Sequence, residues 1–128
     1  MNRKILQLDA REYQALTPQQ RLEKLFSTLP LEEILITSAF STCSVYLLSL
    51  LARFDQKPQI HFIDTGYHFP ETLEYVKQLA KYLHLEVVQL KPIPDDHDIC
   101  TQQEMWSSNP DECCRLNKVK PIQAVFSQ

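Results

Sequence analysis

Glycine is the residue that this sequence most clearly lacks, because Gly66 is the only one in 128 residues. The scarcity argues against a glycine-rich phosphate loop, which needs several glycines at fixed spacing. A single glycine in such a chain marks a position where a positive φ or a close backbone approach requires it. The chain also has no basic run and a net charge of −3, so we expect no nucleic-acid surface.

Long hydrophobic runs are absent too. The longest candidate stretch, residues 45–52, is far too short to span a bilayer, and the first residues show no signal-peptide pattern. We therefore expect a cytoplasmic protein without a membrane segment. The chain is 44% hydrophobic and has no internal repeat or linker, which predicts one small α/β domain over residues 1–128.

The sequence contains four cysteines, Cys43, Cys100, Cys113 and Cys114. An even number is compatible with disulfides, but thiols stay reduced in the cytosol. Metal binding or redox chemistry is therefore the better interpretation for any cysteine that does not simply pack in the core.

Apolar runs alternate with helical patterns along the chain. Buried strands are predicted at residues 33–38, 59–63 and 86–90, and helices at residues 17–29, 45–54, 70–84, 102–106 and from 110 onward, with a loop at 91–98. The βαβαβ order predicts an open parallel sheet with right-handed crossovers and helices on both faces.

A small polar segment, residues 38–44 (SAFSTCS), follows the first predicted strand. Hydroxyl groups and free amides at a helix N-terminus suit an oxyanion ligand. Serines also cap helices for structural reasons alone, so a ligand site and a simple helix start both stay open. We interpret Cys43 as a packing residue rather than a nucleophile.

A second polar turn, Asp64-Thr65-Gly66, joins the second predicted strand to a helix that starts near Pro70. Backbone N–H groups and the positive end of the helix dipole favour phosphate or sulfate there. This turn and residues 38–44 would share the carboxyl edge of the sheet, where open α/β proteins bind ligands. A βα turn without a ligand is the alternative.

The adjacent Cys113 and Cys114 form a third candidate site. Asn109 and Pro110 predict a helix start, which puts both thiols in the first turn, where the dipole lowers thiol pKa values. Thiolates bind iron–sulfur clusters and zinc, whereas neighbouring cysteines make a strained disulfide. Two thiolates do not complete a four-ligand site, and two unremarkable cysteines at a helix start are the alternative.

The four histidines show no metal-ligand spacing. We expect His61 in a strand, His84 at a helix end and His97 in a loop. His68 follows the polar turn and could approach a ligand, and Trp106 is interpreted as a core or lid residue.

Three segments together resemble the reductases that act on adenylyl sulfate or 3′-phosphoadenylyl sulfate in sulfate assimilation and cysteine biosynthesis. They are residues 38–44, 63–72 (IDTGYHFPET) and 113–121 (CCRLNKVKP), and the resemblance covers about residues 35–125. It implies the adenine-nucleotide alpha-hydrolase-like fold, with the first two segments around the nucleotide sulfate. The substrate-binding residues that it implies are Ser38, Phe40, Ser41, Thr42, Asp64, Thr65 and Gly66.

Within this family, the Cys-Cys pair implies the branch that carries a [4Fe–4S] cluster and usually prefers adenylyl sulfate. Cys113 and Cys114 would then be two of the four cluster ligands. The resemblance also implies a reaction in which a cysteine thiolate near the C-terminus attacks the sulfur and releases AMP. Reduced thioredoxin then frees sulfite from the resulting S-sulfocysteine.

The chain departs from the family pattern in its length. Family members continue well beyond the equivalent of Gln128, and the further part would supply a second cysteine pair, more strands and the catalytic cysteine. Cys43 and Cys100 match none of these, so no catalytic residue is assigned. We expect the C-terminal part of the fold to be missing. The first strand would then expose an apolar edge, and we expect the isolated chain to be unstable, to aggregate, or to pair with another copy or a partner.

The resulting prediction is the N-terminal part of an adenylyl-sulfate reductase. One alternative is a non-catalytic nucleotide- or iron–sulfur-binding module completed by a partner chain, and another is specificity for phosphoadenylyl sulfate. A third, a relative of the ATP pyrophosphatases, would need a Ser-Gly-Gly-x-Asp-Ser loop, which residues 38–44 lack.

Overall fold

The computed structural model describes residues 9–127, which fall into two compact units divided between Ile34 and Leu35. The prediction of one domain over the whole chain stays a prediction. Among the described residues, none of the helices has the length and apolar character that crossing a bilayer requires.

The first unit is helical. It consists of α1 (Ala10–Gln14), α2 (Pro18–Thr28) and the 3-10 turn η1 (Leu31–Glu33). The start of α2 is a capping box, as expected: the Thr17 hydroxyl accepts a hydrogen bond from the backbone N–H of Gln20, and the Gln20 side chain accepts one from the N–H of Thr17. The helix ends two residues before Pro30, which cannot continue it.

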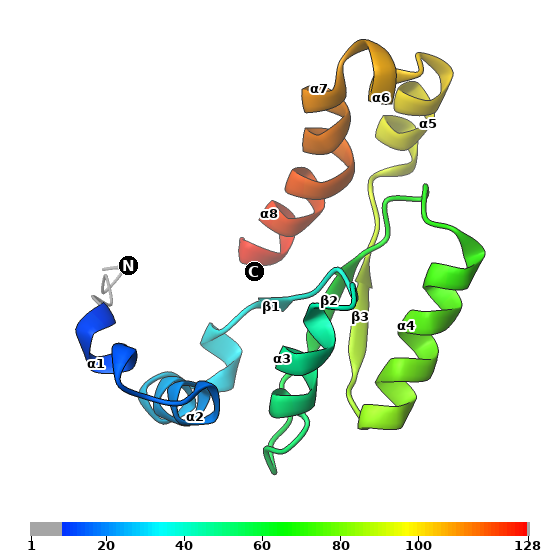
Figure 1. The fold of residues 1–128 in the computed structure, drawn as a ribbon. Helices are drawn as coiled ribbons and strands as arrows, with labels where there is room; N and C mark the ends of the chain where they lie inside the picture. The colour runs from blue at the N-terminus through cyan, green and yellow to red at the C-terminus, as the bar shows by residue number, and fades with distance from the viewer. Residues whose placement is uncertain (1–8, 128) are drawn as a thin grey trace. The chain divides into compact units, whose positions relative to one another are not determined.

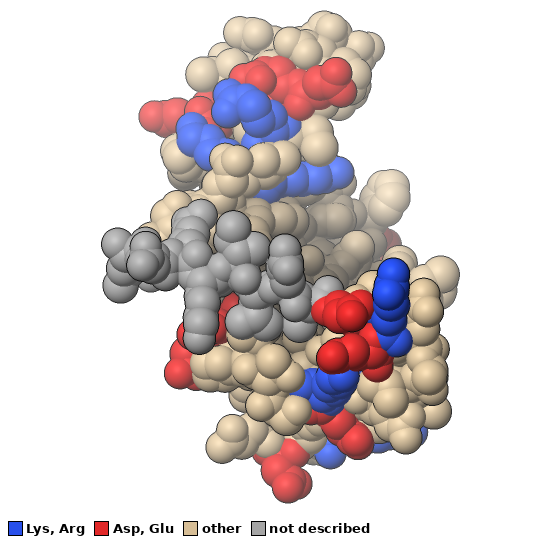
Figure 2. All heavy atoms as spheres, turned by 90° about the vertical axis from the view of Figure 1, so that its left-hand side faces the viewer, with Lys and Arg blue, Asp and Glu red and all other residues tan. Residues whose placement is uncertain are grey.

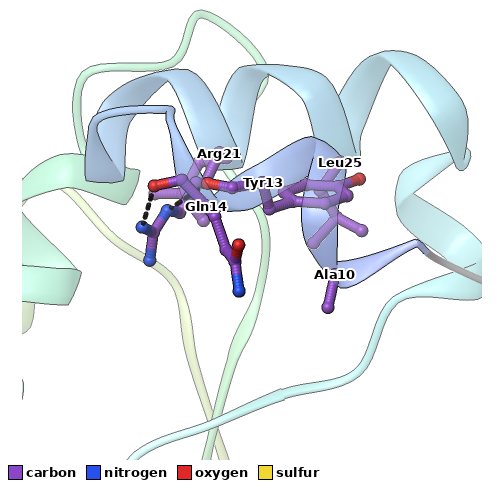
Figure 3. Close-up of a pocket in the computed structure, with 6 residues that line it drawn as sticks. Ala10, Tyr13, Gln14, Arg21 and Leu25 are labelled. Atoms are coloured by element: carbon purple, nitrogen blue, oxygen red, sulfur yellow. Dashed lines mark hydrogen bonds between the residues drawn. The ribbon is translucent and has the colours of Figure 1, made fainter.

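Arg21 of α2 closes the end of α1. Its Nε donates to the carbonyls of Tyr13 at 2.9 Å and Leu16 at 3.1 Å, and its Nη2 donates to the carbonyl of Gln14 at 3.3 Å. The last carbonyls of a helix have no partner within it, so a cation placed there satisfies them. Beside this contact, α1 and α2 enclose a pocket of about 460 Å³ (Figure 3). Its lining residues are Ala10, Tyr13, Gln14, Arg21, Leu22 and Leu25.

The second unit is built on a parallel sheet. Its strands are β1 (Ile36–Thr37), β2 (Ile60–Ile63) and β3 (Val87–Leu90), in the order β1-β2-β3. Two helices make the crossovers, α3 (Ser44–Leu51) and α4 (Pro70–Leu83). The register pairs Ile36 with Ile60 and Ile60 with Val87. The prediction of an open parallel sheet with helices is confirmed.

The core of this unit forms where the crossover helices cover β2. Ile60 and Phe62 are 0% and 1% exposed, which fits the central position of their strand. Leu48 and Leu51 of α3 and Val76 of α4 are buried as well. Full burial of such side chains contributes about 1.5–3 kcal/mol each to folding. This packing holds α3 and α4 against the sheet and so fixes the ends of the strands that they connect.

The first strand is shorter than predicted. Only Ile36 and Thr37 pair with β2, whereas Ile34 and Leu35 lie outside the ladder and are half-buried. Within the described residues β1 is an edge of the sheet. The instability or pairing that we expect from this edge stays a prediction.

A group of short helices follows β3, and here the sequence prediction is partly wrong. The elements are α5 (Pro94–Gln102), α6 (Met105–Ser108), α7 (Pro110–Cys114), the π-helical turn η2 (Arg115–Val119) and α8 (Lys120–Phe126). Residues 94–98, predicted as loop, are the first half of α5. Pro94 occupies the first helical position, and Asp95 and Asp96 interact favourably with the helix dipole, so these residues form a helix start.

The π-helical turn precedes Pro121, which has no N–H to donate to the carbonyl of residue 117. Figure 1 shows α5, α6 and α7 beyond the carboxyl ends of β2 and β3, while α3 and α4 run beside the strands. The helices after β3 therefore overhang the edge of the sheet at which ligands of open α/β proteins bind.

Candidate functional site

Both polar segments predicted from the sequence lie at the carboxyl edge of the sheet. The N–H of Ser38 donates to the carbonyl of His61 at 3.0 Å, which continues the pairing of β1 with β2. The N–H of Asp64 donates to the carbonyl of Leu90 at 2.8 Å and does the same for β2 and β3. The two segments therefore leave neighbouring strands on the same edge.

Phe40, in the segment 38–44, faces the core. Its side chain is 3% exposed and meets the ring of Phe62 edge to face, with the centroids 5.7 Å apart. Its backbone adopts φ 53°, which is uncommon for a residue other than glycine, and its N–H donates to the hydroxyl of Ser38 at 3.1 Å. A ligand here would meet the backbone of Phe40 rather than its ring.

The hydroxyls of Ser41 and Ser44 lie 3.2 Å apart and bond to each other. Cys43 stands at the cap position of α3 without a side-chain hydrogen bond to the helix, and Thr42 is exposed. The first amides of α3 thus have no side-chain cap, which is the feature that the sequence predicted for this segment.

The turn at Asp64, Thr65 and Gly66 is held by its own side chains. The N–H of Gly66 donates to Oδ1 of Asp64 at 3.0 Å, and the N–H of Tyr67 donates to the Thr65 hydroxyl at 3.3 Å. Gly66 has φ +81°, and a Cβ placed on it would lie 2.6 Å from Cε1 of His97. Both reasons for a glycine, a positive φ and a close approach, apply here.

The helix start predicted at Asn109 and Pro110 is present, since the Asn109 side chain accepts from the N–H of Glu112 at 3.4 Å. It places Cys113 in a buried cluster with Cys100, Met105 and Leu116, whereas Cys114 is exposed. Burial, with the neighbouring Cys100 as a second cause, raises the pKa of the Cys113 thiol. The predicted lowering of thiol pKa values at this helix start is therefore wrong for Cys113, because its burial raises the pKa.

One cavity brings the polar turn and the cysteine pair together. It has a volume of about 270 Å³. Its lining residues are Thr65, Tyr67, Trp106, Pro110, Cys113, Cys114, Asn117 and Lys118. A second cavity of about 260 Å³ lies on the other side of the turn. Its lining residues are Asp64, Gly66, Lys91, Pro92, Pro94, His97 and Asp98. Residues 38–44 line neither of these two cavities.

The first cavity is lined by a cation, Lys118, that has no ion pair within residues 9–127. The neighbouring cations are paired. Arg115 binds Glu112 with Nη2 2.6 Å from Oε1, which lowers the pKa of Glu112, and Lys120 binds Asp96. Figure 2 shows lysines and arginines beside acidic side chains in the upper part of the molecule. Lys118 is therefore available to an anion in the cavity.

Sequence reasoning missed three residues of this site. Lys118 and Asn117 each follow a cysteine of the pair by four positions, and this spacing puts them on the same helical face as Cys114 and Cys113. That signal was present in the sequence. His97 had no such signal, because it was predicted to lie in a loop and α5 brings it under Gly66.

His68 and Trp106 both lie near the polar turn. Nε2 of His68 lies 3.0 Å from the carbonyl of Ile63, and its ring packs on Phe62 at 5.1 Å between centroids. His68 therefore braces the end of β2. Trp106 is 48% exposed and meets the ring of Tyr67 at 5.5 Å, at the wall of the first cavity.

The donor set for a metal centre is incomplete in the described part of the chain. Residues 9–127 contain no group of three or more histidine, cysteine, aspartate or glutamate side chains that could hold a metal ion. Cys113 and Cys114 supply two thiols, whereas a [4Fe–4S] cluster needs four ligands. The residues present thus do not fit a cluster held by one copy of this part of the chain alone.

Comparisons with known proteins find relatives of this chain in sequence and in structure. Residues 33–128 match the model of the phosphoadenosine phosphosulfate reductase domain. An adenosine 5′-phosphosulfate reductase of Deinococcus radiodurans is 39% identical over 97 residues, which are 75% of this chain and 38% of that protein. A phosphoadenosine 5′-phosphosulfate reductase of Gloeobacter violaceus is 30% identical over 121 residues, 92% of this chain and 50% of that protein.

A solved structure shows the same fold. The phosphoadenylyl-sulfate reductase of Candida auris, in a phosphate complex, superposes with a TM-score of 0.70 at 26% identity, over 88% of this chain and 56% of that one. The chain thus spans half or less of the length of the two sequence relatives and little more than half of the structural one.

Proposed function

Since the chain belongs to the phosphoadenosine phosphosulfate reductase domain family, we propose that it takes part in the reduction of adenylyl sulfate to sulfite and AMP. The proposal is supported by relatives named for adenosine 5′-phosphosulfate and phosphoadenosine 5′-phosphosulfate reductases. Both of these substrates carry a phosphosulfate anion, so the binding of that anion is the first function to account for.

The cavity between Thr65 and the cysteine pair is the observation that carries this proposal. The Thr65 hydroxyl already accepts a hydrogen bond from the N–H of Tyr67, which leaves its O–H free to donate to an anion. Lys118 supplies a cation that has no other ion pair in the described chain. A phosphosulfate bound between these two groups would lie next to Cys113 and Cys114.

The segment 38–44 contributes the other side of the proposed nucleotide site. The segment carries the hydroxyls of Ser38, Ser41 and Thr42, and it leads into α3, whose first amides have no side-chain cap. It leaves β1 at the edge of the sheet where Asp64 and Gly66 shape the neighbouring turn. Amides at a helix N-terminus bind phosphate groups well. We propose that this segment binds the phosphate end of the phosphosulfate, while Thr65 and Lys118 bind its sulfate end.

We further propose a [4Fe–4S] cluster with Cys113 and Cys114 as two of its ligands. Four cysteine thiolates would hold the iron atoms of such a cluster, which would lie beside the bound anion. Because the described chain supplies two donors, the other two thiolates must come from a second copy or from a completing chain. Thiol ligation also needs a reducing compartment, which supports the cytoplasm as the location.

No residue of the chain is proposed as the nucleophile that attacks the sulfate sulfur. Cys113 is buried, Cys114 is assigned to the cluster, and Cys43 and Cys100 lie outside the first cavity. With reduced thioredoxin as the proposed electron donor, we therefore expect little or no sulfite from the purified chain. A second candidate function, a nucleotide- or cluster-binding module completed by another polypeptide, follows from the same incomplete donor set.

Calorimetric titration with adenylyl sulfate tests the binding step. We expect the Lys118→Gln variant to bind roughly tenfold more weakly, because a charge-assisted hydrogen bond is lost. The matched control is Lys77→Gln, which removes an exposed lysine on α4 and should bind as the wild type does. Equal affinities for the two variants would contradict an anion site at Lys118. A parallel titration with 3′-phosphoadenylyl sulfate ranks the two substrates.

Iron and acid-labile sulfide, measured beside native mass after anaerobic preparation, test the cluster. Roughly four irons shared by two chains would mean that two Cys113–Cys114 pairs complete one centre. The double variant Cys113→Ser/Cys114→Ser should then contain no iron, while Cys43→Ser should keep it. A monomer of the wild-type chain without iron would contradict assembly of the cluster by a second copy.

A further inference from the structure

His97 and Asn117 connect the polar turn to the cysteine pair, although they come from α5 and η2. The ring of His97 fills the space beside Gly66, with Nε2 and Cε1 within 3 Å of where a Cβ on that glycine would stand. Nδ1 of the same ring lies 3.0 Å from Oδ1 of Asn117. The ring is therefore fixed between the turn and the amide.

Asn117 continues the connection to Cys113. Its side chain is buried, with the residue 2% exposed, and its Nδ2 donates to the carbonyl of Cys113 at 2.9 Å and contacts the Sγ at 3.7 Å. Because the NH₂ group faces Cys113, the amide oxygen must face His97. The hydrogen bond between the two residues then requires a proton on Nδ1 of His97, so Asn117 also sets the tautomer of the neutral ring.

Further contacts hold His97 in this position. The ring of Tyr67 lies 4.7 Å from that of His97, and its hydroxyl bonds to Oγ1 of Thr101 at 2.9 Å. Thr101 in turn donates to the backbone carbonyl of His97 at 3.0 Å. Tyr67 directly follows the polar turn, so His97 contacts both the turn, at Gly66, and the residue after it.

We infer that His97 and Asn117 are positioning residues that couple the turn at Gly66 to the Cys113 side chain. A shift of the turn pushes the His97 ring, the ring moves the Asn117 amide, and the amide releases or holds Cys113 in its buried site. This inference deepens the proposed function, because the turn and Cys113 flank the proposed anion cavity. It is tested without any ligand, so its outcome is independent of whether adenylyl sulfate binds.

The test is the rate at which each cysteine of the full, reduced and metal-free chain reacts with N-ethylmaleimide, mapped by mass spectrometry. Loss of one buried hydrogen bond changes a local opening equilibrium by about fivefold. We expect His97→Ala and Asn117→Ala each to speed the alkylation of Cys113 about fivefold. The exposed Cys114 should react as fast as it does in the wild type.

Two controls separate positioning from a general loosening of the fold. Cys100 is 0% exposed and packs in the same cluster as Cys113, so it reports on the integrity of that cluster. We expect Cys100 to stay protected in both variants. The His97→Asn variant retains an N–H near the position of Nδ1 and should restore the slow alkylation of Cys113. The amide of His97→Gln reaches the position of Nε2 instead, so Cys113 should stay fast in that variant.

The coupling to the turn is tested by Gly66→Ala. Its Cβ displaces the His97 ring, so the alkylation of Cys113 should accelerate as it does in His97→Ala, and Gly66→Ala should add no further acceleration in the His97→Ala background. Three results would overturn the inference. They are an unchanged Cys113 rate in His97→Ala, an equal rise of the Cys100 and Cys113 rates, and fully additive effects of Gly66→Ala and His97→Ala.

Discussion

Replacement of Gly66 by alanine should destabilise the protein in two separable ways. The residue has φ +81°, which costs an L-residue about 1–2 kcal/mol, although the stiffer unfolded chain returns about 0.4–1 kcal/mol. The new Cβ would also lie 2.6 Å from Cε1 of His97, so the ring must rotate. An off-rotamer ring costs about 0.5–1.5 kcal/mol, and weakening its hydrogen bond to Asn117 costs a similar amount.

These contributions predict that Gly66→Ala lowers the free energy of unfolding by about 2–4 kcal/mol. In a His97→Ala background the steric part disappears, and the same substitution should cost only about 1 kcal/mol, which is the backbone part. The difference between the two backgrounds is the coupling between the turn and the ring.

Urea unfolding, followed by circular dichroism, measures all four proteins of this cycle. The slope of the free energy with urea should be the same in each, which shows that the variants share a folded state. Equal costs of Gly66→Ala in the two backgrounds would refute the steric contact with His97. A cost near zero in the wild-type background would refute the positive φ as well.

Three further predictions concern helix ends and charge. His84 ends α4 with φ 54°, a conformation that glycine adopts more easily. His84→Gly should therefore raise the free energy of unfolding by about 0.5–1 kcal/mol in urea titrations, and a lower free energy of unfolding would contradict the strained cap. Thr17→Ala removes the capping box with Gln20 and should lower that free energy by about 1 kcal/mol, whereas Thr17→Ser should be nearly neutral. Arg115 lowers the pKa of Glu112 in the folded protein. The pair therefore stabilises the fold fully at pH values above the ordinary glutamate pKa, and this stabilisation is lost as the pH falls through the lowered pKa. NMR titration of Arg115→Gln should show the pKa of Glu112 moving back up, and an unmoved pKa would mean that another group sets it.

The sheet was predictable because its signals are local. The apolar runs that became β2 and β3 are bounded by turn residues, and the capping box at Thr17 and Pro18 is a short pattern with one structural meaning. Gly66 could be predicted as well, since a single glycine in a polar βα turn indicates a backbone requirement. These features depend on neighbours in the sequence.

The features that sequence reasoning missed depend on neighbours in space. Residues 91–98 are predicted as a loop, whereas Pro94 stands at the first helical position of α5, and this helix carries His97 to Gly66. The burial of Cys113 among side chains of three helices reversed the direction expected for its pKa. A helix dipole can be read from the sequence, but desolvation depends on the packed structure.

The proposed function depends on an anion site between Thr65 and Lys118, next to the cysteine pair. A crystal structure of the reduced chain with adenylyl sulfate tests it most directly. We expect phosphosulfate oxygens within hydrogen-bond distance of Nζ of Lys118 and of the Thr65 hydroxyl. Adenylyl sulfate bound with its phosphosulfate in the second cavity, beside Lys91, or away from both cavities, would contradict it.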